Sequence, residues 1–166
     1  MKKRNKFLLQ IVVIALLSFN IQSCGNKPIF EENKEFDAYK WPFNKPLTFS
    51  VNITDTNSYC NLYVNLRVNA NYKYSNIFVW VNETMPDKTV EKKRLEFILA
   101  DEKGNWLGKN ISSIYTYQFQ YKPRVKYKQI GIYSYQIEQN MRDDMLENVV
   151  SAGLRVEPWT QNTKAW

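Results

Sequence analysis

Histidine is absent from the sequence, and this absence excludes several kinds of chemistry at once. Catalytic triads and cysteine–histidine pairs use an imidazole as general base, and histidine is the commonest side chain in protein metal sites. Glycine is scarce, with five residues, and no glycine-rich phosphate-binding loop is present. We therefore expect a protein that is not an enzyme and that holds no metal and no cofactor.

A pair of carboxylates for glycoside hydrolysis remains conceivable, because this reaction needs only two acidic side chains on either side of a cleft. The candidates are Glu96, Asp101, Glu138, Asp143 and Asp144. Each is also explained as a solvated strand end or a helix cap, and the sequence places no two of them opposite each other. A glycosidase is therefore the functional hypothesis that the sequence favours least.

Cysteine is nearly absent as well, and the position of one of the two is informative. The chain opens with a mainly basic stretch (2–6) and an uncharged, mostly apolar stretch (7–21), and Ser23 then precedes Cys24. This order is typical of a secretory signal peptide. The residues that end in Cys24 resemble a bacterial lipobox, so we predict lipidation of Cys24, and several acyl chains anchor a protein stably. Cys60 is then left without a partner for an intrachain disulfide, and we expect it to be a small buried or loop residue.

Bulk charge gives no reason to expect a nucleic-acid partner. The formal net charge is +7, but four of the 23 basic residues and none of the 16 acidic residues precede Cys24, which leaves +3 for the mature chain. Aromatic residues make up 15% of the chain and include eleven tyrosines. This composition favours half-buried strands over disorder.

The mature chain has the length of one domain of ordinary size. We predict a cleaved lipoprotein signal peptide over 1–23, a lipidated polar tether over 24–40, a β-sandwich domain over 41–158 and a C-terminal tail over 159–166. The tether is expected because Pro28 and mixed charges precede the first alternating stretch.

Apolar and polar residues alternate with a period of two along most of the domain, which predicts strands. The stretches are 47–53, 62–68, 77–81, 95–99, 115–121, 132–139 and 154–156. A hairpin turn is expected at Asp101–Asn105, where Gly104 allows a positive φ. The one helical candidate is Met141–Val149, which Asn140 would cap. The pattern indicates an all-β fold: an antiparallel β-sandwich of immunoglobulin-like or jelly-roll type, with seven or eight strands and little helix.

Four cations spaced by two would point to the same side of an extended segment. They are Lys122, Arg124, Lys126 and Lys128. This basic ridge is a candidate surface for an acidic partner or for anionic lipid or lipopolysaccharide head groups. The alternative, which we rank slightly ahead, is an edge strand that lysine protects from aggregation, and Pro123 supports it.

A polar segment at Ile137–Asp144 provides a second candidate partner surface. Glu138 and Arg142 are expected to lie together there, and Arg67 to join them, either as a hydrogen-bonded corner or as an interface. The tryptophans at 80, 106 and 159 would suit a sugar-stacking platform, but core packing and cross-strand pairing explain them more simply.

Several segments of the chain, in the same order, look like the blocks of a known family. They are Asp55-Thr56, Tyr59–Val68, Tyr72–Phe78, Phe97–Asp101, Trp106–Gly108, Ile137–Asp144 and Gly153–Glu157. The chain resembles the GldH-type gliding-motility lipoproteins of Bacteroidota over nearly all of its mature length. This resemblance implies a cell-envelope lipoprotein needed by the gliding machinery and, by association, by type IX secretion. It implies no enzymatic activity and supplies no catalytic or ligand residues.

Two functional hypotheses follow. The first is a lipid-anchored structural or assembly component that holds other gliding and secretion proteins of the envelope through its exposed edges and loops. The second is an envelope lipoprotein that binds glycan or lipopolysaccharide. Because the segment 25–28 lacks the acidic residues that resemble a surface-export signal, we expect an outer-membrane anchor with the domain facing the periplasm.

Overall fold

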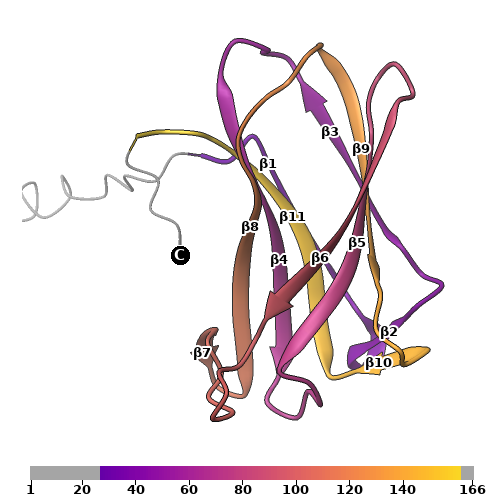
Figure 1. The fold of residues 1–166 in the computed structure, drawn as a ribbon, viewed down its shortest axis with the longest axis vertical. Coiled ribbons are helices and arrows are strands. Elements are labelled where there is room, and N and C mark those ends of the chain that lie inside the picture. Colours follow the sequence, from indigo (N-terminus) through magenta and orange to yellow (C-terminus); the bar gives the residue numbers. More distant parts are fainter. Residues whose placement is uncertain (1–26, 162–166) are drawn as a thin grey trace, which may run out of the picture.

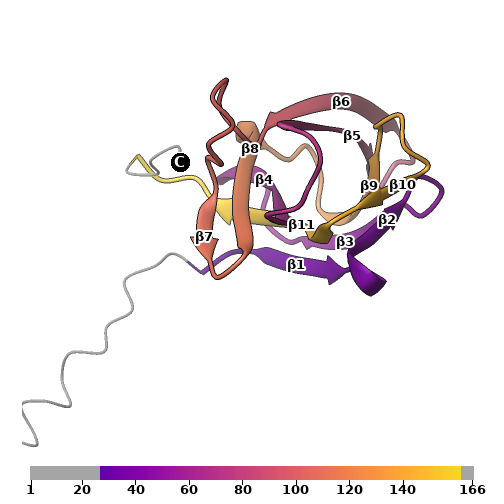
Figure 2. The ribbon, with the colours of Figure 1, turned by 90° about the horizontal axis from the view of Figure 1, so that it is seen from below.

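The computed structural model describes residues 27–161, in which two antiparallel sheets face each other (Figures 1 and 2). The signal peptide and Cys24 lie outside the described residues. The strands are β1 (Phe30–Glu35), β2 (Lys40–Pro42), β3 (Leu47–Ile53), β4 (Tyr59–Asn69), β5 (Asn76–Thr84), β6 (Val90–Ile98), β7 (Lys109–Ile111), β8 (Ile114–Lys126), β9 (Gly131–Gln139), β10 (Met145–Glu147) and β11 (Val149–Pro158). Within this range the helical content is one short 3-10 element, η1 (Asp37–Tyr39), and no helix is long and apolar enough to cross a membrane.

One sheet has five strands in the order β1-β11-β4-β8-β7, and the other has four in the order β3-β9-β5-β6. A short ladder of β2 and β10 lies at one end. The predicted antiparallel sandwich is therefore confirmed. Eight strands have six or more residues, as expected, and three strands of three residues add to them.

The core lies between the sheets and is built from the alternating apolar residues. Along β3 every second residue is buried, beginning with Leu47, and β5 shows the same alternation. Cys60 belongs to this core and is 2% exposed, and its burial raises the pKa of the thiol. The predicted turn at Asp101–Asn105 is also present, with Gly104 at a φ of +83°.

The first strand lies where we expected the polar tether. Phe30–Glu35 pairs with β11 over its whole length. The ring of Phe30 packs edge-on against Phe49 at 6.4 Å, and the Lys34 ammonium donates to the backbone oxygen of Thr48 at 2.6 Å. The tether prediction is wrong for this stretch, because pairing with a distant strand supplies the hydrogen bonds that the local sequence does not suggest.

The expected helix at Met141–Val149 is also wrong. Met145–Glu147 forms β10, which pairs with β2 and buries Leu146 beside Trp41. Asn148 then takes a left-handed φ of 64° and turns the chain into β11. Burial of one apolar side chain in the sandwich outweighs the weak helical preference of this polar segment.

Candidate functional site

Among the described strands, no backbone pairing joins the two sheets along the side on which β6 and β8 lie. β6 is the last strand of its sheet, and β7 covers the edge of β8 only as far as Thr116. Both strands therefore present unpaired edges over part of their length. We call the groove between these two edges the seam. It has two halves of different chemistry, and Figure 2 shows β6 and β8 where the two sheets approach each other on this side.

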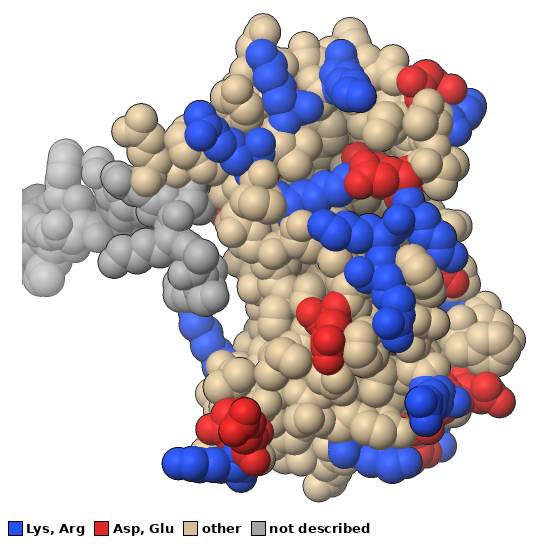
Figure 3. Space-filling model, viewed as in Figure 1, with Lys and Arg blue, Asp and Glu red and all other residues tan. Residues whose placement is uncertain are grey.

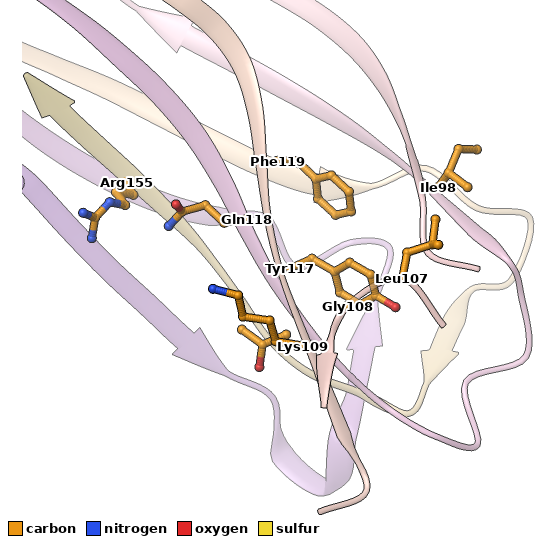
Figure 4. Close-up of a pocket in the computed structure, with 9 residues that line it drawn as sticks. Ile98, Leu107, Gly108, Lys109, Tyr117, Gln118, Phe119 and Arg155 are labelled. Carbon is orange, nitrogen blue, oxygen red and sulfur yellow. The ribbon is translucent and has the colours of Figure 1, made fainter. Parts of the chain in front are cut away.

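The half of the seam near β7 is aromatic and hollow. A cavity of about 670 Å³ lies there (Figure 4). It is lined by Ile98, Leu107, Gly108, Lys109, Thr116, Tyr117, Gln118, Phe119 and Arg155. The ring of Phe119 stacks on Phe97 at 4.3 Å and lies 5.4 Å from Tyr117. Leu107 and Ile98 are 59% and 50% exposed, so apolar side chains without cover line the mouth of the cavity.

Gly108 and Tyr117 fix the shape of this cavity. A Cβ atom at Gly108 would lie 2.6 Å from the ring of Tyr117, so a larger residue would displace the ring. The Tyr117 hydroxyl donates to the backbone oxygen of Leu99 at 2.7 Å. Burial raises the pKa of Tyr117 to about 12. The aromatic wall is therefore a packed and rigid surface.

Arg155 and Gln118 form a polar wall on the other side of β8 from Tyr117 and Phe119 (Figure 4), and both side chains already have hydrogen-bond partners. The Arg155 guanidinium bonds the carboxylates of Glu31 and Glu157, and the latter pair is 2.9 Å apart. The Gln118 amide donates to Asn65 at 3.2 Å. Because two carboxylates neutralise Arg155, this wall suits hydrogen bonding with a peptide or another polar group better than the binding of an anion.

The other half of the seam is ionic and closed. The Lys122 ammonium reaches across from β8 and bonds Glu83 of β5 at 2.6 Å and Glu91 of β6 at 2.9 Å. The hydroxyl of Tyr135 donates to Glu83 at 3.0 Å and lies 3.0 Å from the hydroxyl of Tyr127. Burial lowers the pKa of Lys122, but hydrogen bonds from its ammonium to the two carboxylates outweigh it, and the net shift is upward. This group joins the two sheets.

Two irregularities in β8 turn Lys122 into the seam. Tyr63 lies opposite Gln120, whereas Leu62 lies opposite Lys122, so β8 carries an extra residue at this point. A second extra residue lies before Val125, which faces Cys60. Bulges of this kind re-aim side chains and end regular pairing.

The basic ridge is therefore not formed as expected. Lys122 points between the sheets, while Arg124 lies outside, over the rings of Tyr59 at 5.1 Å and Trp159 at 4.8 Å. Arg124 has a left-handed φ of 51°, and its backbone N–H donates to Asn61 at 2.9 Å. The remaining members, Lys126 and Lys128, are exposed at the same end. A spacing of two fails here because the bulges break the alternation.

The second predicted surface is likewise divided. Arg67 lies on β4 of the five-stranded sheet, 4.0 Å from Glu35. Glu138 lies on β9 of the other sheet and accepts a hydrogen bond from Asn82 at 2.7 Å. Arg142 is exposed in the segment after β9. The structure does not bring these residues into one corner, and their role in partner binding stays a prediction.

The three tryptophans have different surroundings. Trp80 stacks with the Lys92 ammonium at 4.6 Å, and Trp106 packs on Tyr115 at 5.2 Å. Trp159 belongs to the group around Arg124. They form no common sugar-stacking platform. Between residues 27 and 161, no group of three or more aspartate, glutamate, cysteine or histidine side chains is arranged to hold a metal ion.

Sequence reasoning missed the aromatic cavity. The available signal was Leu107, an apolar residue between Trp106 and Gly108, followed by the tyrosines of β8. Its significance depends on Phe97 and Phe119, which come from different sheets and meet only in the folded chain.

A family model and two relatives of known name match this chain, and all three belong to one family. The family model described as GldH lipoprotein matches residues 28–156. Gliding motility lipoprotein GldH of Flavobacterium johnsoniae is 30% identical over 164 residues, which cover 95% of this chain and 98% of the relative. The GldH homolog of Christiangramia forsetii is 27% identical over 161 residues, with 93% and 97% covered. A solved structure, that of infectious bursal disease virus, aligns with 15% identity and a TM-score of 0.33, over 82% of this chain and 31% of the viral chain.

Proposed function

Because the chain belongs to the GldH lipoprotein family, we propose that it is a lipid-anchored component of the gliding motility apparatus. In this role it holds other envelope proteins in place and carries out no reaction, and it is associated with type IX secretion. The observation that carries the proposal is the family match, which spans almost the whole described domain. The names of the two relatives, both gliding motility lipoproteins, support the same role.

The aromatic half of the seam is the surface that best suits a protein partner. The edge of β8 between Tyr117 and Gln120 pairs with no strand in the range 27–161, and apolar side chains line the groove beside it. An extended segment of another protein can add to such an edge by backbone hydrogen bonds, while its side chains enter the adjoining pockets. These features support the proposal that the exposed edge of β8 serves in assembly.

Deletion of the gene tests the proposed role. Loss of spreading on agar and of type IX secretion, both restored by the wild-type gene, is the expected result. Normal spreading and secretion in the deletion strain would contradict the proposal. Photo-crosslinking groups at Leu107 and, as a matched exposed control, at Phe43 should capture an envelope protein only from the first position.

The alternative of glycan or lipopolysaccharide binding loses its main support, because the tryptophans lie apart. Glycan-array binding that disappears on substitution of Trp106 and Trp80 would restore it. For localisation we propose an outer-membrane anchor with the domain in the periplasm. Protease added to intact cells should leave the protein uncut, and rapid cleavage would place it on the surface instead.

A further inference from the structure

One end of the sandwich is close to the lipid anchor along the chain. Six residue steps separate Cys24 from Phe30, where β1 begins, and so short a segment reaches at most about 20 Å. The eleven residues of β4 run along the sandwich for about 36 Å. An anchored molecule therefore keeps the end at which β1 begins near the membrane, while the other end can lie well beyond it.

We propose that this anchor-side end docks on the surface of a bilayer that contains anionic phospholipids. The anchor-side end consists of the segments 54–59, 85–90 and 124–132 together with Trp159. The proposal rests on the lipid anchor of the proposed function and adds an orientation and a lipid preference to it.

The anchor-side end combines cations with exposed apolar side chains. Its cations are Lys88, Arg124, Lys126 and Lys128, and Figure 3 shows blue groups along this upper end of the molecule. Val90, Ile130 and Ile132 are exposed by 60% or more. Tyrosine and tryptophan with nearby lysine and arginine are typical of surfaces that lie at the level of lipid head groups.

The acidic residues of this end are engaged by their own turns. Asp55 accepts a hydrogen bond from the backbone of Asn57 at 2.7 Å, and Asp87 accepts one from Thr89 at 2.9 Å. Neither carboxylate lies within ion-pair distance of a lysine or arginine in the described part of the chain, although Lys126, after the hydrogen bonds from Ser58 and Asn57, helps to lower the pKa of Asp55. At the opposite end, by contrast, Lys40 pairs with Glu147 at 3.2 Å. The unbalanced positive charge is thus on the side of the anchor.

Arg124 is the best-placed contact for a lipid phosphate. Its guanidinium is held over two rings, at 5.1 Å from Tyr59 and 4.8 Å from Trp159, and it has no acidic partner among the described residues. Its left-handed φ of 51° is uncommon for a residue with a side chain, and the buried Asn61 holds this conformation. Strained residues that are held in place in this way often serve a function. A fixed, exposed guanidinium suits a phosphate oxygen well.

Lysine labelling of the acylated, full mature chain tests the proposal. The protein is reconstituted into vesicles of phosphatidylcholine alone or with three parts in ten of phosphatidylglycerol, and labelling of each lysine is followed by mass spectrometry. We expect Lys126 and Lys128 to react about fivefold or more slowly in the anionic vesicles than in detergent. Lys45 and Lys103, at the opposite end, should react equally in both, and 1 M salt should reduce the protection.

Arg124→Gln should remove most of this protection, and Arg94→Gln, at an arginine that also lies over an aromatic ring (Phe78, at 4.1 Å) but on the four-stranded sheet, should leave it unchanged. Equal labelling at both ends in anionic vesicles overturns the proposal even if the deletion strain has lost motility. Equal protection in neutral and anionic vesicles overturns the lipid preference. A mature chain that carries no acyl group overturns the anchor and this inference together, whereas normal motility of the deletion strain overturns the proposed function alone.

Discussion

The two halves of the seam join the same two strands in different ways. In the ionic half, Lys122 crosses between the sheets to Glu83 and Glu91, and bulges in β8 interrupt its edge. In the aromatic half, Phe119 stacks on Phe97, and the edge of β8 stays regular. Inward-pointing charges and bulges are the devices with which natural sheets prevent the addition of further strands. The comparison shows that the molecule protects one half of this edge and leaves the other open.

Removal of the buried ammonium should have the largest effect. The side chains of Lys122 and Glu83 are 17% and 7% exposed, so Lys122→Ala leaves the buried carboxylate of Glu83 without its cationic partner. We expect a loss of about 3–5 kcal/mol in the free energy of unfolding, measured by urea denaturation. Lys103→Ala, at an exposed lysine in the turn at Asp101–Asn105, is the control and should change stability by less than about 0.5 kcal/mol.

A double variant distinguishes a lost partner from a lost stabilising pair. Glu83→Leu combined with Lys122→Met replaces both charges by apolar side chains, which is often neutral for a buried pair. Its stability should lie within about 1 kcal/mol of the wild type. A double variant as unstable as Lys122→Ala would show that the ionic half contributes net stability.

Truncation in the aromatic half should cost less. Phe119 is only partly buried but packs between two other rings, so Phe119→Ala should lower the free energy of unfolding by about 2–3 kcal/mol. Phe119→Leu should recover more than half of this loss. A loss as large as that of Lys122→Ala would mean that the two halves do not differ in their effect on stability.

Alkaline pH should also destabilise the aromatic half. An unfolded tyrosine releases its proton near pH 10, whereas the pKa of Tyr117 is about 12 in the folded protein. The stability that comes from the neutral hydroxyl is therefore complete below about pH 10 and is lost as the pH rises toward 12, on the order of 2 kcal/mol. Urea midpoints at pH 9, 10 and 11 should fall, and they should fall less steeply in Tyr117→Phe.

The smallest effect on stability is expected at the mouth of the cavity. Leu107 is 59% exposed, so Leu107→Ser should change the free energy of unfolding by less than about 0.5 kcal/mol. Spreading on agar should nevertheless be reduced, because the variant removes an apolar contact from the proposed partner surface. Normal spreading would contradict the proposal that the aromatic half of the seam binds a partner.

The sequence predicted those features that depend on local alternation. The strand at Leu47–Ile53 and the turn at Asp101–Asn105 could be predicted because residues that are adjacent in the sequence determine both the alternating burial and the turn geometry. Two strands could not be predicted in this way, namely Phe30–Glu35 and Met145–Glu147. Each forms a strand because it pairs with a segment far away in the chain.

The same limit applies to the candidate surfaces. The spacing of Lys122 and Arg124 predicted one face, but a bulge places them on opposite sides of the sheet. The cavity depends on the meeting of Phe97 and Phe119 from two sheets, which periodicity alone does not reveal. The sequence identifies the charged and aromatic residues, but only the folded structure shows which of them lie next to one another.

The position of β1 has a mechanical consequence. β1 follows directly on the short segment from the anchor and pairs antiparallel with β11 from Phe30 to Glu35. A pull on the anchor, opposed by a partner held at the seam, loads this ladder along the strand. All of its hydrogen bonds then resist together in shear, instead of opening one after another from an end. A first strand placed in this way can carry tension between a membrane and a moving protein assembly without being peeled from its sheet.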